Sequence, residues 1–344
     1  MKYIGNKTRL LGFIYNSLLE DKIPIQGTFF DIFGGTGSVG RYFKEKGMSI
    51  ISNDIMSYSY YHQYANVYLN KMPSFKKISK DGITGIINIL NNLSPIENGY
   101  VYNNFAPSGT YNRQYFSDLN AQKIDAVREK IEEWFLKGLI NVDEKIILVD
   151  SLVDAADFVA NISGTYGAYL KIWRSMALKP LYLKAPNIFD NNKANQIYQE
   201  DANTLIKKIK CDILYIDPPY NERQYAPNFH VLETLTVWDK TELKGKTGQR
   251  NYDEKKSLYC LRNEATEAFR NLIDNANAKY VVVSYNNEGI ISKNDLLSIL
   301  KNKGEVIEHK KEYRRFRTEK DNNHRKYKQC DDKVIEHLYV VTVE

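Results

Sequence analysis

Residues 28–54 read TFFDIFGGTGSVGRYFKEKGMSIISND, and this stretch decides the fold. The apolar run that opens it leads directly into glycines 34, 35 and 37, after which an amphipathic helix is expected as far as about residue 46. A second apolar run ends at Asp54. Strand, glycine loop, helix, strand and acid in this order begin a doubly wound nucleotide-binding sheet.

The remaining chain predicts five further strands and a long helical insert. The strand candidates, in addition to 28–33 and 48–53, are 196–200, 212–217, 279–285, 305–313 and 334–343. Residues 72–195 have helical periodicity instead, with one helix expected from Ser117 or Asp118 to about 137 and another from Asn141 to about 161. We therefore expect an α/β fold with a seven-stranded Rossmann-like sheet, its last strand antiparallel. Residues 1–71 and 196–344 would build this sheet domain, and a mainly helical domain at 72–195 would interrupt it.

Composition narrows the class of protein. The chain has 344 residues, of which 43% are hydrophobic and 26% charged, as in globular proteins. Its net charge of +6 is compatible with a polyanionic partner. The three cysteines are widely spaced and the five histidines have no metal-ligand spacing, so we expect neither a metal site nor a disulfide framework. No apolar run reaches transmembrane length and no signal peptide is evident, which predicts a cytoplasmic protein without a membrane partner.

The glycine loop alone leaves its ligand open. Residues 35–40 match the G-x-G-x-x-G string of dinucleotide sites, so a nicotinamide or flavin enzyme is one interpretation. A tight strand-to-helix turn without any ligand is another. Asp54, placed just after the second strand, suits the ribose hydroxyls of any adenosine.

A second motif, Asp217-Pro218-Pro219-Tyr220, separates these interpretations. It follows the apolar run 213–216, and its prolines must end that strand because they fix φ and offer no N–H. The Asp217 carboxylate and the Pro218 carbonyl could accept the two hydrogens of an exocyclic amino group, while Tyr220 stacks on the ring that bears it. A methyltransferase acting on an amino nitrogen needs this arrangement and a dehydrogenase does not.

Together these motifs resemble the D12 class of N6-adenine DNA methyltransferases, the Dam-like group with the alpha motif order. The resemblance rests on residues 2–7 (KYIGNK), 33–37 (FGGTG), Asp54 and 217–220 (DPPY), and it covers almost the whole chain. Residues 221–225 and 164–169 look like the modification enzymes of type II and IIS restriction systems.

The resemblance implies a cofactor, partners and site residues. The cofactor would be S-adenosyl-L-methionine, and the partners double-stranded DNA and a restriction endonuclease, with the helical insert as the target-recognition domain. Catalysis would fall to Asp217, Pro218, Pro219 and Tyr220. The cofactor-binding residues would be Tyr3, Lys7, Asp31, Phe33, Gly35, Gly37, Asp54, Asp201 and Asp217, with Tyr3 and Lys7 at its methionine end. For Asp201 the sequence equally allows a helix N-cap.

DNA contacts are expected in three places. Residues 310–328 contain nine Lys or Arg against three acids, at the end of the sixth strand on the ligand-binding edge. A basic loop there would neutralise phosphates, unless it is only a solvated hairpin. Polar positions beside the catalytic turn and in loops of the insert add further candidates. The candidate DNA-binding residues are Tyr111, Arg113, Tyr166, Lys171, Arg174, Arg223, Gln224, Arg314, Arg315 and Arg317.

We therefore hypothesise direct methyl transfer to N6 of an adenine flipped out of the duplex, because a stacked base cannot be reached. The same turn would also serve an enzyme that methylates RNA or N4 of cytosine. A catalytically silent nucleic-acid-binding protein and a nicotinamide oxidoreductase are the remaining alternatives.

Overall fold

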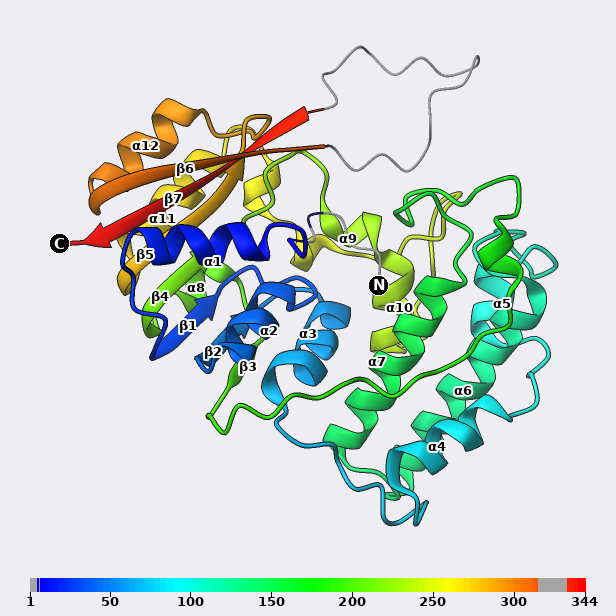
Figure 1. Ribbon diagram of the computed structural model, residues 1–344. Helices are drawn as coiled ribbons and strands as arrows, with labels where there is room; N and C mark the ends of the chain where they lie inside the picture. Colours follow the sequence, from blue (N-terminus) through cyan, green and yellow to red (C-terminus); the bar gives the residue numbers. More distant parts are fainter. Residues whose placement is uncertain (1–4, 6, 315–332) are drawn as a thin grey trace. The chain divides into compact units, whose positions relative to one another are not determined.

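The computed structural model describes residues 5, 7–314 and 333–344, which form two compact units (Figure 1). One unit includes Met56–Asp190 and Tyr225–Lys255, and the other includes Asn6–Ile55, Asn191–Gln224 and Lys256–Glu344. Segments 56–71 and 225–255 thus group with the helical insert, although the sequence boundaries had placed them with the sheet. The functions assigned to the two domains stay predictions.

The second unit is built on a seven-stranded sheet, which confirms the predicted fold. Its strands lie in the order β3-β2-β1-β4-β5-β7-β6. In chain order they are β1 (Thr28–Asp31), β2 (Ser49–Asn53), β3 (Gln196–Tyr198), β4 (Lys210–Ile216), β5 (Asn277–Asn286), β6 (Gly304–Arg314) and β7 (Lys333–Val343). The last strand, β7, pairs antiparallel with both β5 and β6, and the other pairings are parallel.

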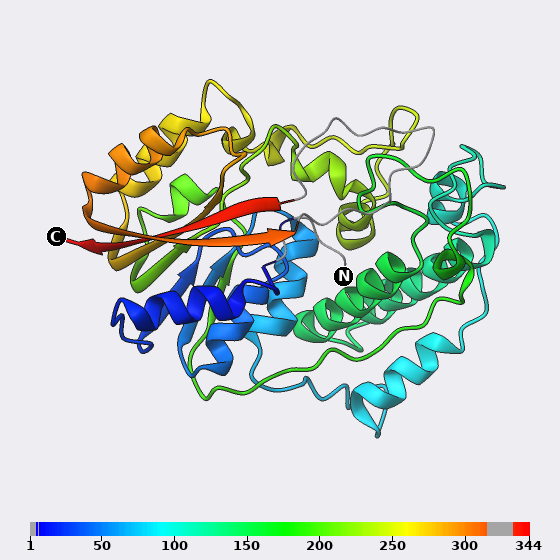
Figure 2. The same cartoon turned by 45° about the horizontal axis from the view of Figure 1, so that its top comes forward.

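Alternation along the strands supplies a core on each face of this sheet. Phe29 stacks on Phe43 at a centroid distance of 4.0 Å, on the face covered by α1 (Leu11–Glu20) and α2 (Ser38–Glu45). The next residue, Phe30, points to the opposite face because successive strand residues alternate. There it joins a buried cluster with helices α8 (Ala202–Leu205), α11 (Ala265–Asp274) and α12 (Lys293–Lys301). Figure 2 shows α1 and α12 on opposite sides of the β6–β7 pair.

Helices dominate the described part of the other unit. They are α3 (Ser57–Gln63), a π-helical turn (Tyr64–Tyr68), α4 (Gly82–Asn91), α5 (Tyr100–Phe105), α6 (Asp118–Leu136), α7 (Val142–Phe158), α9 (Tyr225–Asn228) and α10 (His230–Val237). Short 3-10 turns lie at Ser175–Leu178 and Asp253–Lys255 here, and at Leu258–Cys260 in the sheet unit. Along the described part of the chain, no helix is both long enough and apolar enough to cross a membrane.

The two longest helices begin where the sequence predicted. The Ser117 hydroxyl accepts a hydrogen bond from the Asn120 amide and caps α6. Asn141 and Glu144 form a reciprocal capping box at the start of α7. This helix ends three residues earlier than expected, at Phe158, and Asn161 binds the carbonyl oxygen of Leu170 instead.

Asn53 organises the sheet edge at which the glycine loop begins. Its amide nitrogen lies 3.1 Å from the carbonyl oxygens of both Ile32 and Glu200, and its amide oxygen accepts from the Glu200 N–H at 3.0 Å. The side chain is buried, so these bonds fasten the ends of β1, β2 and β3 together.

Replacing Asn53 should therefore destabilise the protein, while replacing its neighbour Ser52 should not. Asn53→Ala leaves buried backbone groups unpaired, each at about 1–3 kcal/mol, and we expect a loss of about 2–4 kcal/mol. The Ser52 hydroxyl is buried with no hydrogen-bond partner among the described residues, so Ser52→Ala should stay within about 0.5 kcal/mol. Urea unfolding followed by circular dichroism measures both. Equal losses in the two variants would contradict this account.

Candidate active site

The glycine loop has the backbone geometry that its sequence predicted. Gly35 and Gly37 have φ values of 50° and 71°, in the left-handed region that favours glycine. The Gly35 amide donates to the Asp54 carboxylate at 3.0 Å, which ties the loop to the residue that follows β2. The loop and its acid thus form one structure at the carboxyl edge of the sheet.

Asp31 lies beneath this loop and is 1% exposed. Burial raises its pKa from 3.8 to about 8, and the negative charge of Asp217 adds to the rise. Hydrogen bonds from the backbone of Gly40 and Phe33 oppose the rise but do not cancel it. Its Oδ1 atom is buried without a hydrogen-bond partner among the described residues. A positive charge brought close to Asp31 would therefore lower its pKa and favour the ionised carboxylate.

Lys7 contacts two carboxylates of the sheet unit. Its ammonium lies 3.2 Å from Asp217 Oδ1 and 2.5 Å from Glu336 Oε1, and only 5% of the side chain is exposed. The sequence interpretation paired Lys7 with a carboxylate of the cofactor. In the structure this ammonium contacts Asp217 and Glu336, and a contact between Lys7 and a cofactor stays a prediction.

This arrangement sets the protonation of the catalytic candidate. Burial raises the pKa of Asp217 to about 7, although the Lys7 ammonium lowers it and Glu336 raises it further. The Lys7 pKa rises well above its ordinary value, because the attraction of Asp217 and Glu336 outweighs the effect of burial. Lys7 is thus a fixed positive charge, whereas Asp217 titrates near neutral pH.

Glu336 is a member of this cluster that sequence reasoning missed. It lies on β7, is 1% exposed and accepts a hydrogen bond from the Ser284 hydroxyl on β5. Its β7 alternation with the buried residues Val334 and Leu338 was the available signal, since it places a charged residue at an inward position. Pairing of β7 with β5 brings this acid to the carboxyl edge of β4.

The Asp-Pro-Pro-Tyr turn is held on both sides. The Tyr220 ring meets Tyr285 edge to face at 6.1 Å, and the Lys7 ammonium lies 5.6 Å from the Tyr220 centroid. The Tyr220 carbonyl accepts from the Ile290 amide at 2.9 Å. Pro218 is buried and Tyr220 is partly exposed, so the turn presents an aromatic ring from a rigid base.

Two further cofactor candidates lie near α8. Asp201 accepts from the Thr204 amide at 2.9 Å and is the N-cap of α8, which confirms one of its two proposed roles. Phe33 meets the buried Tyr259 edge to face at 5.0 Å. The Tyr259 hydroxyl in turn donates to Asn203 of α8 at 2.7 Å.

The chemistry of this edge fits a positively charged ligand. Asp217 and Glu336 both contact the Lys7 ammonium, and Asp31 lies close enough to Asp217 for that charge to raise the Asp31 pKa. Asp31 Oδ1 and Glu336 Oε2 are buried without hydrogen-bond partners among the described residues. A sulfonium or ammonium group would favour the ionised form of Asp31 and Asp217, so S-adenosylmethionine fits the residues present. Residues 5, 7–314 and 333–344 include no group of three His, Cys, Asp or Glu that could hold a metal ion.

The candidate DNA-binding residues have different placements. Tyr111, Lys171 and Arg223 are exposed. Arg174 is partly exposed and donates to the Ile162 carbonyl at 2.6 Å. Arg314 is the last residue of β6, and Tyr3, Arg315 and Arg317 lie outside the described residues.

Three candidates make internal contacts. Tyr166 is fully buried and donates its hydroxyl to Asp157, and Arg113 is 4% exposed with its guanidinium donating to three carbonyl groups. Neither offers a surface to DNA, and we correct both assignments. The Gln224 amide is paired with the backbone of Ser257 in both directions, at 2.9 and 2.8 Å, which attaches the segment after the Asp-Pro-Pro-Tyr turn to Ser257. Polarity in a loop does not distinguish such internal contacts from external ones.

Comparison with known proteins finds the family that the sequence motifs resemble, and the match covers most of the chain. The family described as D12 class N6 adenine-specific DNA methyltransferase matches residues 3–299. The chain is 40% identical over 346 residues to the type II methyltransferase M.FokI of Planomicrobium okeanokoites, covering 99% of this chain and 52% of that protein. It is 41% identical over 301 residues to the modification methylase StsI of Streptococcus sanguinis, covering 88% and 46%. The type II methyltransferase M.NlaIII of Neisseria lactamica is 40% identical over 331 residues, with 94% of each chain covered. The chain thus spans about half the length of the first two relatives.

The raised pKa of Asp31 makes a pH-dependent prediction. Because the native state favours the protonated acid, ionising Asp31 between about pH 4 and 8 costs stability. Asp31→Asn removes that cost. The free energy of unfolding of the variant, relative to that of the wild type, should therefore rise by up to about 1.4 kcal/mol per pH unit across this window and level off above it. Urea unfolding at pH 5, 6.5 and 8, without ligand, measures the gain.

Asp212→Asn is the matched control. Hydrogen bonds from Lys279 and Thr28 lower the pKa of Asp212, so its contribution is fully present above pH 4 and should not change from pH 5 to 8. A gain for Asp31→Asn that is equal at all three pH values would contradict the buried-acid interpretation.

Proposed function

This chain belongs to the family of D12 class N6 adenine-specific DNA methyltransferases, and we propose that it methylates N6 of an adenine within a specific sequence of double-stranded DNA. The observation that carries this proposal is the buried Lys7–Asp217–Glu336 cluster at the base of the Asp-Pro-Pro-Tyr turn. Relatives named as type II methyltransferases support a second part of the proposal, which concerns the biological role. The enzyme would protect its DNA from a partner restriction endonuclease.

The glycine loop and the acids around it would bind S-adenosyl-L-methionine. When bound, this cofactor supplies an electrophilic methyl group on a positively charged sulfur. Asp31 would offset the positive charge, Asp54 would accept the ribose hydroxyls, and Phe33 would flank the cofactor. Gly35 and Gly37 allow the close approach that this pocket requires. Asp201 would contribute near the adenine end of the cofactor while capping α8.

The turn would orient the amino group of the target adenine. The Asp217 carboxylate and the Pro218 carbonyl accept its two hydrogens, which directs the nitrogen lone pair away from the ring plane and toward the methyl donor. Lys7 and Glu336 fix the position of Asp217. As the N–C bond forms and the S–C bond breaks, N6 becomes positively charged and must lose a proton. A carboxylate with a pKa of about 7 is suited to accept it.

Tyr220 would help to hold the base outside the duplex. Flipping a base costs a few kcal/mol. Stacking on an aromatic side chain returns about 1–3 kcal/mol, and Pro219 limits the freedom of the turn that carries this ring.

Methyl transfer with labelled S-adenosylmethionine tests the proposed reaction. We expect label in duplex DNA, as N6-methyladenine, at one short recurring sequence. Mapping of modified bases after incubation with mixed-sequence DNA gives the result. Label in cytosine, label in RNA alone or no transfer would overturn the proposal.

Substitutions at the turn test the assigned roles. Asp217→Ala should bind cofactor but lose methyl transfer by at least about 10²–10³-fold, because a preorganised partner of the reacting group is gone. Lys7 keeps Glu336 as its partner in this variant, so the fold should survive. Tyr220→Ala should be strongly impaired, whereas Tyr220→Phe retains the stacking ring and should stay near the wild-type rate. Wild-type turnover by Asp217→Ala would contradict the mechanism.

A further inference from the structure

A short hairpin at 244–249, which the sequence did not single out, projects two lysines from the helical unit. Lys244 and Gln249 exchange backbone hydrogen bonds at 2.8 Å in each direction. Gly245 and Gly248 both have a φ of 71°, which the tight turn requires. Lys244 and Lys246 are exposed on it.

Arg113 fastens this hairpin to a second loop. Its guanidinium donates to the carbonyl oxygens of Gly245 at 3.0 Å and Lys246 at 3.2 Å, and to that of Asn104 at 3.0 Å. The buried arginine therefore connects loop 103–114 to the hairpin. It also lies 4.5 Å from the ring centroid of Tyr111, whose side chain is 50% exposed.

The next residue, Gln114, fastens a third loop. Its amide donates to the carbonyl oxygens of Leu170 and Lys171, both at 3.1 Å. Asn161 adds a bond to Leu170 at 2.9 Å. Two consecutive side chains thus join segments 103–114, 161–174 and 244–249, which we call the three-loop surface.

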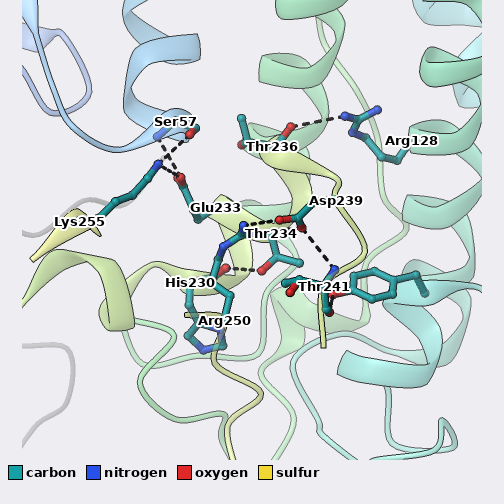
Figure 3. A network of polar contacts seen from close by, with 11 residues as sticks. Ser57, Arg128, His230, Glu233, Thr234, Thr236, Asp239, Thr241, Arg250 and Lys255 are labelled. Atoms are coloured by element: carbon teal, nitrogen blue, oxygen red, sulfur yellow. Dashed lines mark hydrogen bonds and ion pairs between the residues drawn. The ribbon is translucent and has the colours of Figure 1, made fainter. Parts of the chain in front are cut away.

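Both flanks of the hairpin are also anchored within this unit (Figure 3). Arg250 pairs with Asp239 at 2.7 Å, and Lys255 pairs with the buried Glu233 of α10. The Tyr100 hydroxyl donates to the Thr241 carbonyl at 2.6 Å. The exposed lysines are consequently carried on a fixed backbone.

The three segments carry cations but no acid of their own, and the Asp118 carboxylate accepts hydrogen bonds from Ser108 of the first segment. None of the three segments contains Asp or Glu, although the chain has 42 of these acids in 344 residues. Lys171, Lys244 and Lys246 are exposed, whereas Arg113, the cation of the first segment, is buried. Ile172, beside Lys171, is 83% exposed. Three exposed ammonium groups, with no acid in their own segments, give this surface a charge complementary to that of a polyanion.

We propose that the three-loop surface binds the sugar-phosphate backbone of duplex DNA, with Lys244 and Lys246 each neutralising a phosphate. This inference rests on the proposed function and assigns a DNA contact to it. Phosphate contacts add affinity and position the duplex without reading its sequence. The hairpin therefore governs affinity and salt dependence, and leaves the recognised sequence unchanged.

The double variant Lys244→Ala/Lys246→Ala tests the inference in DNA binding measured between 50 and 200 mM salt. Loss of two phosphate contacts should reduce the slope of log affinity against log salt by about 1.8. Affinity should fall at every salt concentration, while the turnover at saturating DNA and the methylated sequence stay as in the wild type. Lys244→Arg/Lys246→Arg retains both charges and should restore the slope.

The matched control is Lys76→Ala/Lys80→Ala, which removes the same charge from exposed positions of the segment leading into α4 (Figure 1). Its slope should equal that of the wild type. In the opposite outcome, the Lys244→Ala/Lys246→Ala variant keeps the wild-type slope while the wild-type protein methylates DNA. That result would contradict DNA binding by the three-loop surface and leave the proposed function standing. If the wild-type protein neither binds nor methylates duplex DNA, both proposals fail.

Discussion

The sheet unit depends on one buried ammonium between two carboxylates. Removing the charge of Lys7 from water costs several kcal/mol, and only the attraction of nearby opposite charges offsets this cost. Asp217 and Glu336 supply it from the end of β4 and from β7. The cluster therefore constrains three distant parts of the sequence at once. It requires Lys7 to lie at the carboxyl edge of the sheet and β7 to lie beside β5. The same contacts fix the carboxylate on which the proposed chemistry depends.

Asp31, near Asp217, adds a carboxyl group beside this cluster, and the resulting excess of carboxyl groups suits the edge to a positively charged ligand. Asp31 and Asp217 have pKa values raised to about 8 and 7, so ionising them without a further cation is unfavourable. A structural ion pair would be more stable with matched charges. Here the protein retains an excess of carboxyl groups at the edge where the glycine loop permits close approach. A positively charged cofactor would remove the penalty, so its binding and the ionisation of these acids favour each other.

The fold and the centre of the site could be predicted from sequence because their signals are local. Asp217-Pro218-Pro219-Tyr220 ends a strand by the chemistry of proline, and Gly35 and Gly37 occupy positive φ where the turn requires it. Glu336 could not be placed in the same way. Its role depends on β7 lying between β5 and β6, a long-range pairing that periodicity does not specify. Asp201 shows an intermediate case, since its capping role is local and was predictable, whereas a contact with cofactor depends on the whole edge.

The loops of the helical unit show why polar composition alone misassigned Arg113. A planar guanidinium has five donors in a fixed fork, so it can satisfy several backbone carbonyls in a buried position. An ammonium is a strongly hydrated point charge that remains in solvent more readily. The structure follows this difference, with Arg113 buried against the carbonyls of Gly245 and Lys246 while Lys244 and Lys246 stay exposed. The arginine organises the backbone from within, and that fixed backbone presents the lysines outward, where a phosphate could reach them.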